Sequence, residues 1–282
     1  MKPAVTLGLV LFPCLSFLAY AQQSSPSLVL YDNFNASRID PAKWSGTFGD
    51  TSDLREAVRE LAPGPDLDDA PDSDGDRRLH LSLNSYAATS GDGGGIGGLF
   101  GLQFANPRSL TEISFTVVAK KAVAIGCATN PSGNAVTAAE FRGRFFNTEL
   151  SPTSDLGDVE LAIGLQRAST DAGTPLTVLA FYQRCDNAGC SARTTLDFQI
   201  LGSANLGQTV KLRVKWDQPN HRFIFRMNNA VEVVSAYAVS DSFLAFFPGK
   251  TIDIAKGVPN CTTQPRPVAS MDAFFDNVFV NP

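Results

Sequence analysis

Three stretches of this 282-residue chain, 141–147, 158–166 and 177–184, alternate apolar residues with basic, acidic or aromatic ones. Side chains of a β-strand point alternately to its two sides, so each stretch predicts a strand with one apolar and one polar face. If the three strands are neighbours, their polar faces form one surface. The candidate ligand-binding residues on it are Arg142, Arg144, Asp158, Glu160, Tyr182 and Arg184.

The side-chain chemistry of this surface suits a sugar ligand. Guanidinium groups donate paired hydrogen bonds to hydroxyls or to a carboxylate, carboxylates accept hydrogen bonds, and a tyrosine ring packs against the face of a sugar. We therefore expect a glycan or polysaccharide as the partner. The alternative is cross-strand ion pairing on a solvated sheet face, worth roughly a few tenths of a kcal/mol per pair.

Asp158 and Glu160 are also candidates for catalysis, because their spacing puts both on one side of a strand. Retaining glycosidases hold two carboxyl groups about 5–5.5 Å apart, one as nucleophile and one as acid and base. The same two residues are equally consistent with the wet side of an ordinary strand, so no catalytic residue is assigned.

Six aspartates lie between Asp66 and Asp76, and oxygen ligands at this density are typical of Ca²⁺ sites. Asp72, Asp74 and Asp76 are the candidate ligands. The EF-hand register fails, because with Gly75 in sixth place it begins at Ala70. A solvated acidic loop is the alternative, and no other cofactor is expected.

The N-terminus predicts export. Residues 1–21 resemble a cleaved signal peptide, with a basic start, an apolar stretch at 7–18 and an A-x-A site at 19–21. No later apolar run is long enough to span a membrane. We therefore expect residues 22–282 to form one secreted or periplasmic domain. The net charge of −5 argues against a nucleic-acid partner.

An even number of cysteines remains after residue 21, which in an exported chain predicts disulfides. Four cysteines allow three connectivities. Cys185 and Cys190 can close a tight loop, which leaves Cys127 to pair with Cys261.

Most of the remaining sequence predicts short strands. The residues at 210, 212, 214 and 216 are apolar and alternate with lysine or arginine, which places Trp216 in the core. Leu54–Leu61 fits a helix or a strand, and its all-β context favours a strand. We expect about a dozen strands in a two-sheet, antiparallel, jelly-roll-like sandwich, with Tyr31–Phe34 and Phe275–Val280 side by side.

Three segments resemble the concanavalin A-like lectin/glucanase superfamily: Tyr31–Trp44, with its YDNFN and IDPAKW motifs, the meander 209–229, and Phe275–Val280. The resemblance implies the same sandwich, which hosts lectins, hydrolases, lyases and adhesive modules. Its retaining glucanases carry Glu-x-Asp-x-x-Glu, whereas Asp155–Glu160 here has the reversed spacing. Its alginate-lyase-like members pair an arginine-rich strand with Gln-x-His. Arg142-Gly-Arg144 matches the first element in part, and the sequence has no Gln-x-His.

Three functions follow as hypotheses. The leading one is an exported, non-enzymatic carbohydrate-binding or surface-associated module. The second is a polysaccharide-degrading enzyme, a glycoside hydrolase or a lyase, and the third is a structural or adhesive domain without a small ligand. A deep groove across the predicted polar face favours the enzyme, an aromatic platform the lectin, and a flat ion-paired face the structural domain. The sequence predicts neither the glycan nor the oligomeric state.

Overall fold

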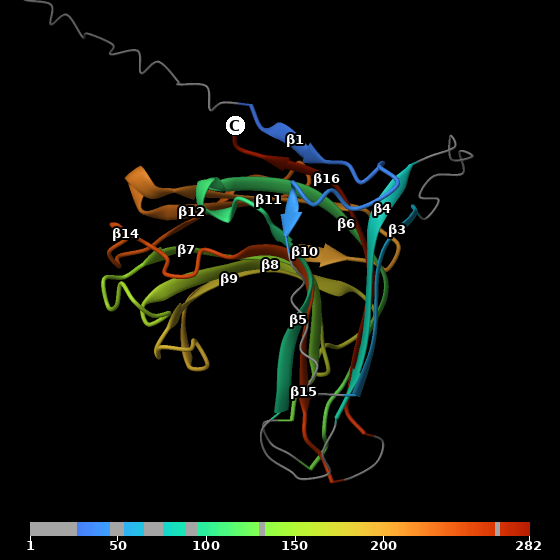
Figure 1. Cartoon of the computed structure of the whole chain (residues 1–282). Coiled ribbons are helices and arrows are strands. Elements are labelled where there is room, and N and C mark those ends of the chain that lie inside the picture. Colours follow the sequence, from blue (N-terminus) through green and yellow to red (C-terminus); the bar gives the residue numbers. More distant parts are fainter. Residues whose placement is uncertain (1–26, 46–53, 65–75, 88–94, 130–132, 263–265) are drawn as a thin grey trace, which may run out of the picture.

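Alternating apolar residues along nearly every strand build a sandwich of two antiparallel sheets, which confirms the predicted fold class. The computed structural model describes residues 27–45, 54–64, 76–87, 95–129, 133–262 and 266–282. Figure 1 shows the two sheets stacked face to face, with β3, β4, β5 and β15 running down from them. The predicted signal peptide and most of the acidic loop, including Asp72 and Asp74, lie outside the described residues.

The first sheet, called sheet A, has β1 at one end of β16, beside the main path of strands. The strands of that path, in order, are β13 (Val233–Ala236), β12 (Arg222–Met227), β11 (Val210–Asp217), β6 (Glu112–Ile125), β16 (Val268–Val280), β4 (Arg77–Tyr86) and β3 (Leu54–Pro63). The strand β1 (Val29–Asp32) pairs with β16 in the register Val29↔Val280. The predicted pairing of the two ends of the domain is thus confirmed, and Leu54–Leu61 is a strand.

The second sheet, called sheet B, carries most of the residues singled out above. Its strands, in order, are β10 (Arg193–Ala204), β9 (Leu176–Cys185), β8 (Asp158–Ala168), β7 (Val136–Asn147), β15 (Lys250–Pro259), β5 (Gly95–Phe104) and β2 (Trp44–Ser45), with β14 (Phe243–Leu244) beside β7. Two short 3₁₀ turns, Pro107–Ser109 and Gln218–Asn220, complete the described elements. The strands β7, β8 and β9 are neighbours, as predicted.

Phenylalanine and aliphatic side chains from both sheets fill the space between them. Trp216 is buried there as predicted. It stacks on Phe146 and donates a 2.6 Å hydrogen bond from Nε1 to the hydroxyl of Tyr237. A register shift next to Arg144 lets both Phe145 and Phe146 point into this core. Beyond Arg144 the bulge therefore reverses which side chains of β7 point outward.

Both predicted disulfides are confirmed. The bridge between Cys127 and Cys261 joins the segment after β6 of sheet A to the segment after β15 of sheet B. The bridge between Cys185 and Cys190 closes the loop between β9 and β10. The long bridge therefore ties the two sheets together, whereas the short one shapes the edge of sheet B.

Candidate functional site

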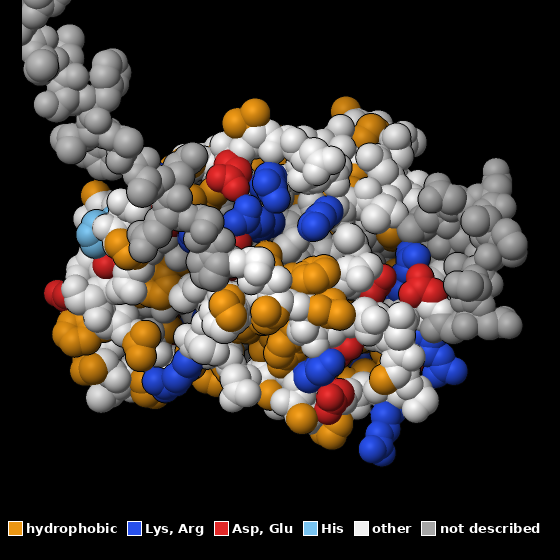
Figure 2. Space-filling view, turned by 90° about the horizontal axis from the view of Figure 1, so that it is seen from above, with side chains coloured by type: hydrophobic (Ala, Val, Ile, Leu, Met, Phe, Trp, Pro, Cys, Tyr) orange, Lys and Arg blue, Asp and Glu red, His pale blue; other side chains and the backbone are white. Residues whose placement is uncertain are grey.

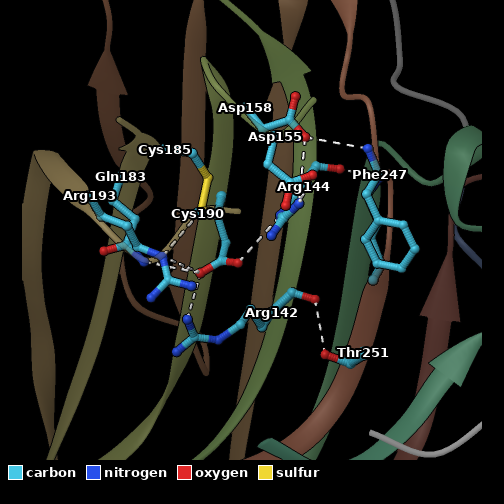
Figure 3. Close-up of polar contacts among 12 residues, drawn as sticks. Arg142, Arg144, Asp155, Asp158, Gln183, Cys185, Cys190, Arg193, Phe247 and Thr251 are labelled. Atoms are coloured by element: carbon cyan, nitrogen blue, oxygen red, sulfur yellow. Dashed lines mark hydrogen bonds and ion pairs between the residues drawn. A yellow bond between two sulfur atoms is a disulfide. The ribbon is translucent and has the colours of Figure 1, made fainter. Parts of the chain in front are cut away.

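The outer face of sheet B is hollowed into a groove. Two adjoining pockets of about 120 and 640 Å³ form it and share four lining residues, Leu99, Arg142, Glu160 and Arg193. These residues come from β5, β7, β8 and β10, so the groove runs across the strands. Four inter-strand spacings of about 4.8 Å separate β10 from β15, roughly 19 Å in all. Figure 3 shows Gln183 and Arg193 on one side of Arg144 and Phe247 on the other.

Strand register brings the centre of the groove together. Arg144, Glu160 and Gln183 lie directly opposite one another on β7, β8 and β9. Gln183 donates a hydrogen bond of 3.0 Å from Nε2 to Oε1 of Glu160, and Arg144 Nε lies 3.7 Å from Oε2. Arg193 Nε lies 4.0 Å from Oε1. Glu160 is therefore a carboxylate surrounded by donors from three other strands.

The pKa of Glu160 reflects these neighbours. Burial alone would raise the pKa of this carboxyl, but the positive charges of Arg142, Arg193 and Arg144 together hold it below the usual range. Arg142 Nη1 lies closest, at 2.6 Å from Oε1. Glu160 is thus ionised at neutral pH and acts as a hydrogen-bond acceptor.

Arg142 connects this centre to a buried floor. It crosses Ala162, its register partner on β8, and its guanidinium lies 5.8 Å from the ring of Phe181. It also binds Oε1 of Glu140 at 2.7 Å through both Nε and Nη2. Burial would lower the pKa of Arg142, but Glu140 and Glu160 outweigh it and raise that pKa above its ordinary value. Arg142 therefore stays charged at the base of the groove.

Two buried carboxyls face each other below Arg142. Glu140 on β7 and Asp253 on β15 are direct register partners, and Gly164 opposite Glu140 leaves room for its side chain, since a Cβ there would lie 2.5 Å from the Glu140 Cβ. Burial raises the pKa of both carboxyls, and the charge of Glu140 helps to raise that of Asp253 to about 8. Asp253 is therefore mostly protonated at neutral pH and hydrogen-bonded to Thr251.

Asp158 has a different task from Glu160. Its carboxylate is fully buried and accepts hydrogen bonds from Asn147 Nδ2 at 2.8 Å and from the backbone amides of Phe246 and Phe247. Burial raises the pKa of Asp158. Arg144 Nη1 lies 3.6 Å from it and 2.8 Å from Asp155. Asp158 thus anchors the segment after β14 and does not line the groove.

The structure brings four of the six predicted ligand-binding residues together, namely Arg142, Arg144, Asp158 and Glu160. The expectation for Tyr182 is wrong: its ring is buried in the core, and its hydroxyl lies 3.0 Å from Ser235 Oγ. The side chains of β9 alternate in the opposite sense to that predicted. Phe181, and not Tyr182, points outward and packs under Arg142. Arg184 lies two residues after Tyr182 on the same strand and forms an ion pair with Asp186 at 3.1 Å. It does not line the groove.

Several site residues were not found from the sequence. Gln183 was missed because the side chains of β9 were expected to point the opposite way. Arg193 was missed because the sequence near Cys190 does not alternate. Asp253 lies on β15, whose Lys-Thr-Ile-Asp-Ile-Ala run does alternate and could have revealed a strand. Phe247 ends a run of five apolar residues, Phe243–Phe247, that is followed by Pro248 and shows no alternation.

The calcium candidates receive no further support. Asp76, the described member of the three, lies 3.5 Å from Arg78 Nη2. Within the described ranges, no group of three histidine, cysteine, aspartate or glutamate residues is arranged to hold a metal ion. Calcium binding by the acidic loop therefore stays an expectation from the sequence.

Comparisons with known proteins show only distant likenesses. No family model matches the chain, and no curated protein matches it. A laminarinase from Flavobacterium sp. UMI-01 aligns over 91% of this chain and 100% of its own, with 10% identity and a TM-score of 0.42. The catalytic domain of an endo-1,3-β-glucanase from Thermotoga petrophila RKU-1 covers 90% and 98%, with 11% identity and a TM-score of 0.37.

A third structure, lectin UEA-II complexed with galactose, covers 79% of this chain and 92% of its own, with 9% identity and a TM-score of 0.33. At these low scores and identities, the likenesses carry no inference about this chain's chemistry. No helix among the described residues has the length and apolar character needed to cross a lipid bilayer.

Proposed function

We propose that this chain is an exported glycan-binding module whose ligand lies in the groove across sheet B. The observation that carries the proposal is the groove lining itself: Arg142, Arg144 and Arg193 surround one ionised carboxylate, Glu160. Planar donors fixed around an acceptor match the adjacent hydroxyls of a sugar, which both donate and accept hydrogen bonds. The two disulfides and the signal-peptide pattern of residues 1–21 support export.

The free-energy cost of burying the charged groups of the site supports a functional role. Burying an ion pair is often no better for stability than apolar packing, because each charge loses its water. Glu140, Glu160 and Arg142 are nevertheless all held in or under the groove, with at most 14% of any side chain exposed. A solvated structural face would not need this arrangement.

The same lining argues against hydrolysis. Glycoside hydrolases use two carboxyl groups, one of which must be protonated to release the leaving group. Glu160 is the single carboxylate among the described residues that line the two pockets, and its lowered pKa keeps it ionised. Asp158 is buried with both oxygens occupied. A binding function therefore fits better than the catalytic pair expected as an alternative.

The test is a glycan array on residues 22–282, with reducing-end and unsaturated-product assays on each glycan that binds. Arg193→Ala is the informative variant, because Arg193 lines both pockets and its side chain is 39% exposed, so its loss should leave the fold intact. Arg184→Ala is the matched control, since Arg184 is 32% exposed on the neighbouring strand and lies outside the lining.

We expect Arg193→Ala to weaken binding about tenfold, as for one charge-assisted hydrogen bond, and Arg184→Ala to leave it unchanged. Absence of any bound glycan, or equal losses in both variants, would contradict the proposal. If the wild-type protein releases sugar products, the chain is an enzyme and not a binding module.

A further inference from the structure

An exposed aromatic segment borders one end of the groove. The phenylalanine loop, defined here as residues 243–249, contains Phe243, Leu244, Phe246 and Phe247, whose exposed fractions range from 43% to 59%. Four large apolar side chains in consecutive or near-consecutive positions form an exposed patch, and such patches on soluble domains often mark binding sites.

The backbone of this loop is held in place. β14 pairs with β7 in the register Phe243↔Asn147, and Asp158 accepts hydrogen bonds from the amides of Phe246 and Phe247. Arg144 N donates to Gly249 O at 3.0 Å. Ala245 is buried between the exposed residues. The rings are therefore presented by a fixed backbone, which reduces the entropy lost when a ligand binds.

Phe247 is the member of the loop that reaches the groove. It lines the smaller pocket together with Arg142, Arg144 and Glu160. Its ring lies 5.7 Å from the Arg144 guanidinium and packs over Gly249, where a Cβ would come within 2.6 Å of the ring. The ring thus stands beside the polar lining, which Figure 3 shows, and 43% of the residue remains exposed.

Most charged side chains of the groove are paired with a carboxylate; Arg193 lies 4.0 Å from Glu160, and Lys256 Nζ lies 3.1 Å from Ser85 Oγ. Arg142 is paired with Glu140 and Glu160, and Arg144 with Asp155 and Asp158. A polyanion would have to displace these carboxylates or lie against Glu160 at short range, which costs electrostatic energy. A neutral sugar can instead use the paired groups as donors and acceptors without bringing a charge of its own.

We propose that Phe247 forms a stacking subsite for a neutral, hydroxyl-rich polysaccharide, and that the ligand's next ring lies on the Arg142–Arg144–Glu160 lining. This inference rests on the proposed glycan-binding function and specifies its ligand class. The C–H face of a pyranose packs on the flat face of an aromatic ring, while its equatorial hydroxyls reach the neighbouring polar groups. The other exposed apolar residues of the loop do not line the described pockets.

Affinity electrophoresis tests the subsite with three neutral polysaccharides, xylan, laminarin and galactomannan, and two acidic ones, alginate and polygalacturonate. Phe247→Leu keeps apolar bulk but removes the flat ring, and Phe247→Tyr keeps the ring. Phe243→Ala removes a phenylalanine that is slightly more exposed than Phe247 and lies outside the groove. Melting temperatures accompany each variant as a folding control.

We expect the wild type to be retarded by at least one neutral polysaccharide and by neither acidic one. Phe247→Leu should weaken that retardation about fivefold to tenfold, the contribution of one aromatic contact, whereas Phe247→Tyr and Phe243→Ala should leave it within about twofold.

Tighter retardation by the acidic polymers, or an unchanged Phe247→Leu, would overturn this inference. If Arg193→Ala still weakens binding in that case, the proposed function stands. Equal losses in Phe243→Ala and Phe247→Leu would make the loop a general apolar surface and would also overturn it. A wild type that binds neither these five polymers nor any array glycan would contradict the proposed function itself.

Discussion

Both sheets of the sandwich carry ion pairs on their outer faces, but water reaches the two sets differently. On sheet A, His80 lies between Glu60 and Asp272, and Arg213 between Glu112 and Glu232. Glu112 is buried, but Glu60 is 54% and Glu232 42% exposed. On sheet B, the carboxyls of Glu140, Glu160 and Asp158 are almost entirely buried. Figure 2, which views the molecule from above Figure 1, shows acidic, basic and hydrophobic side chains side by side.

The difference separates ion pairs that merely cover a surface from those that build a site. Exposed pairs contribute about 0–1 kcal/mol and tolerate substitution. Buried pairs contribute little as a set, but removing one partner leaves an uncompensated charge and costs several kcal/mol. Four carboxyls of sheet B have perturbed pKa values, namely Glu140, Asp158, Glu160 and Asp253. On sheet A, burial raises the pKa of Asp276 to about 6.

The largest effect is expected at Arg142. Arg142→Met leaves both Glu140 and Glu160 without their closest cation, so the free energy of unfolding should fall by about 3–5 kcal/mol. On sheet A, Arg222→Met removes a 37%-exposed partner of Asp217 and should cost less than about 1 kcal/mol. Urea denaturation at pH 7 measures both. Similar decreases in the free energy of unfolding for the two variants would contradict the proposed difference between the two faces.

A pH-dependent effect is expected at Asp253. Its folded-state pKa of about 8 exceeds the unfolded value, so the folded state binds the extra proton and stability falls as pH rises from about 4 to 8. Asp253→Asn stays neutral throughout this range. The variant should therefore gain about 1–3 kcal/mol relative to wild type at pH 8 and nothing at pH 4. Thermal melts of both proteins at the two pH values test this prediction. A stability difference that does not change with pH would show that Asp253 is ionised in the folded state.

The smallest effect is expected at His80 on sheet A. The hydrogen bond to Asp272, with that to Glu60, raises the pKa of His80 above its usual value. Its stabilising contribution is then present below the unfolded pKa and is lost as pH rises through the folded one. Because the carboxylates are partly exposed, His80→Gln should cost less than about 1 kcal/mol at pH 5.5 and still less at pH 8.5. NMR titration of the His80 ring checks the direction, and a lowered pKa would refute it.

Strand alternation predicted the fold well because most strands have one apolar and one polar side. The run 210–216 is the clearest case, and it placed Trp216 correctly in the core. The same signal placed Arg142, Arg144, Asp158 and Glu160 on one face, since each of them alternates with large apolar residues.

Alternation failed where both sides of a strand are apolar. In Val178-Leu-Ala-Phe-Tyr182 all residues are apolar or aromatic, so the pattern does not show which of them point inward. In the structure Phe181 points outward and packs against Arg142 from β7. The role of Asp158 was equally out of reach, because two of its partners are backbone amides about 90 residues away. Parts of the groove are formed by loops and by strands that are far apart in the sequence, and no local sequence pattern predicts such contacts.

The central claim is that the outer face of sheet B, and not that of sheet A, holds the ligand. Hydrogen–deuterium exchange with and without a glycan selected on the array tests it most directly. We predict added protection in 186–193 and 243–249, which border the groove, and none in 54–63 or 218–236 of sheet A. Protection confined to the sheet A segments, with the groove segments unchanged, would contradict the account.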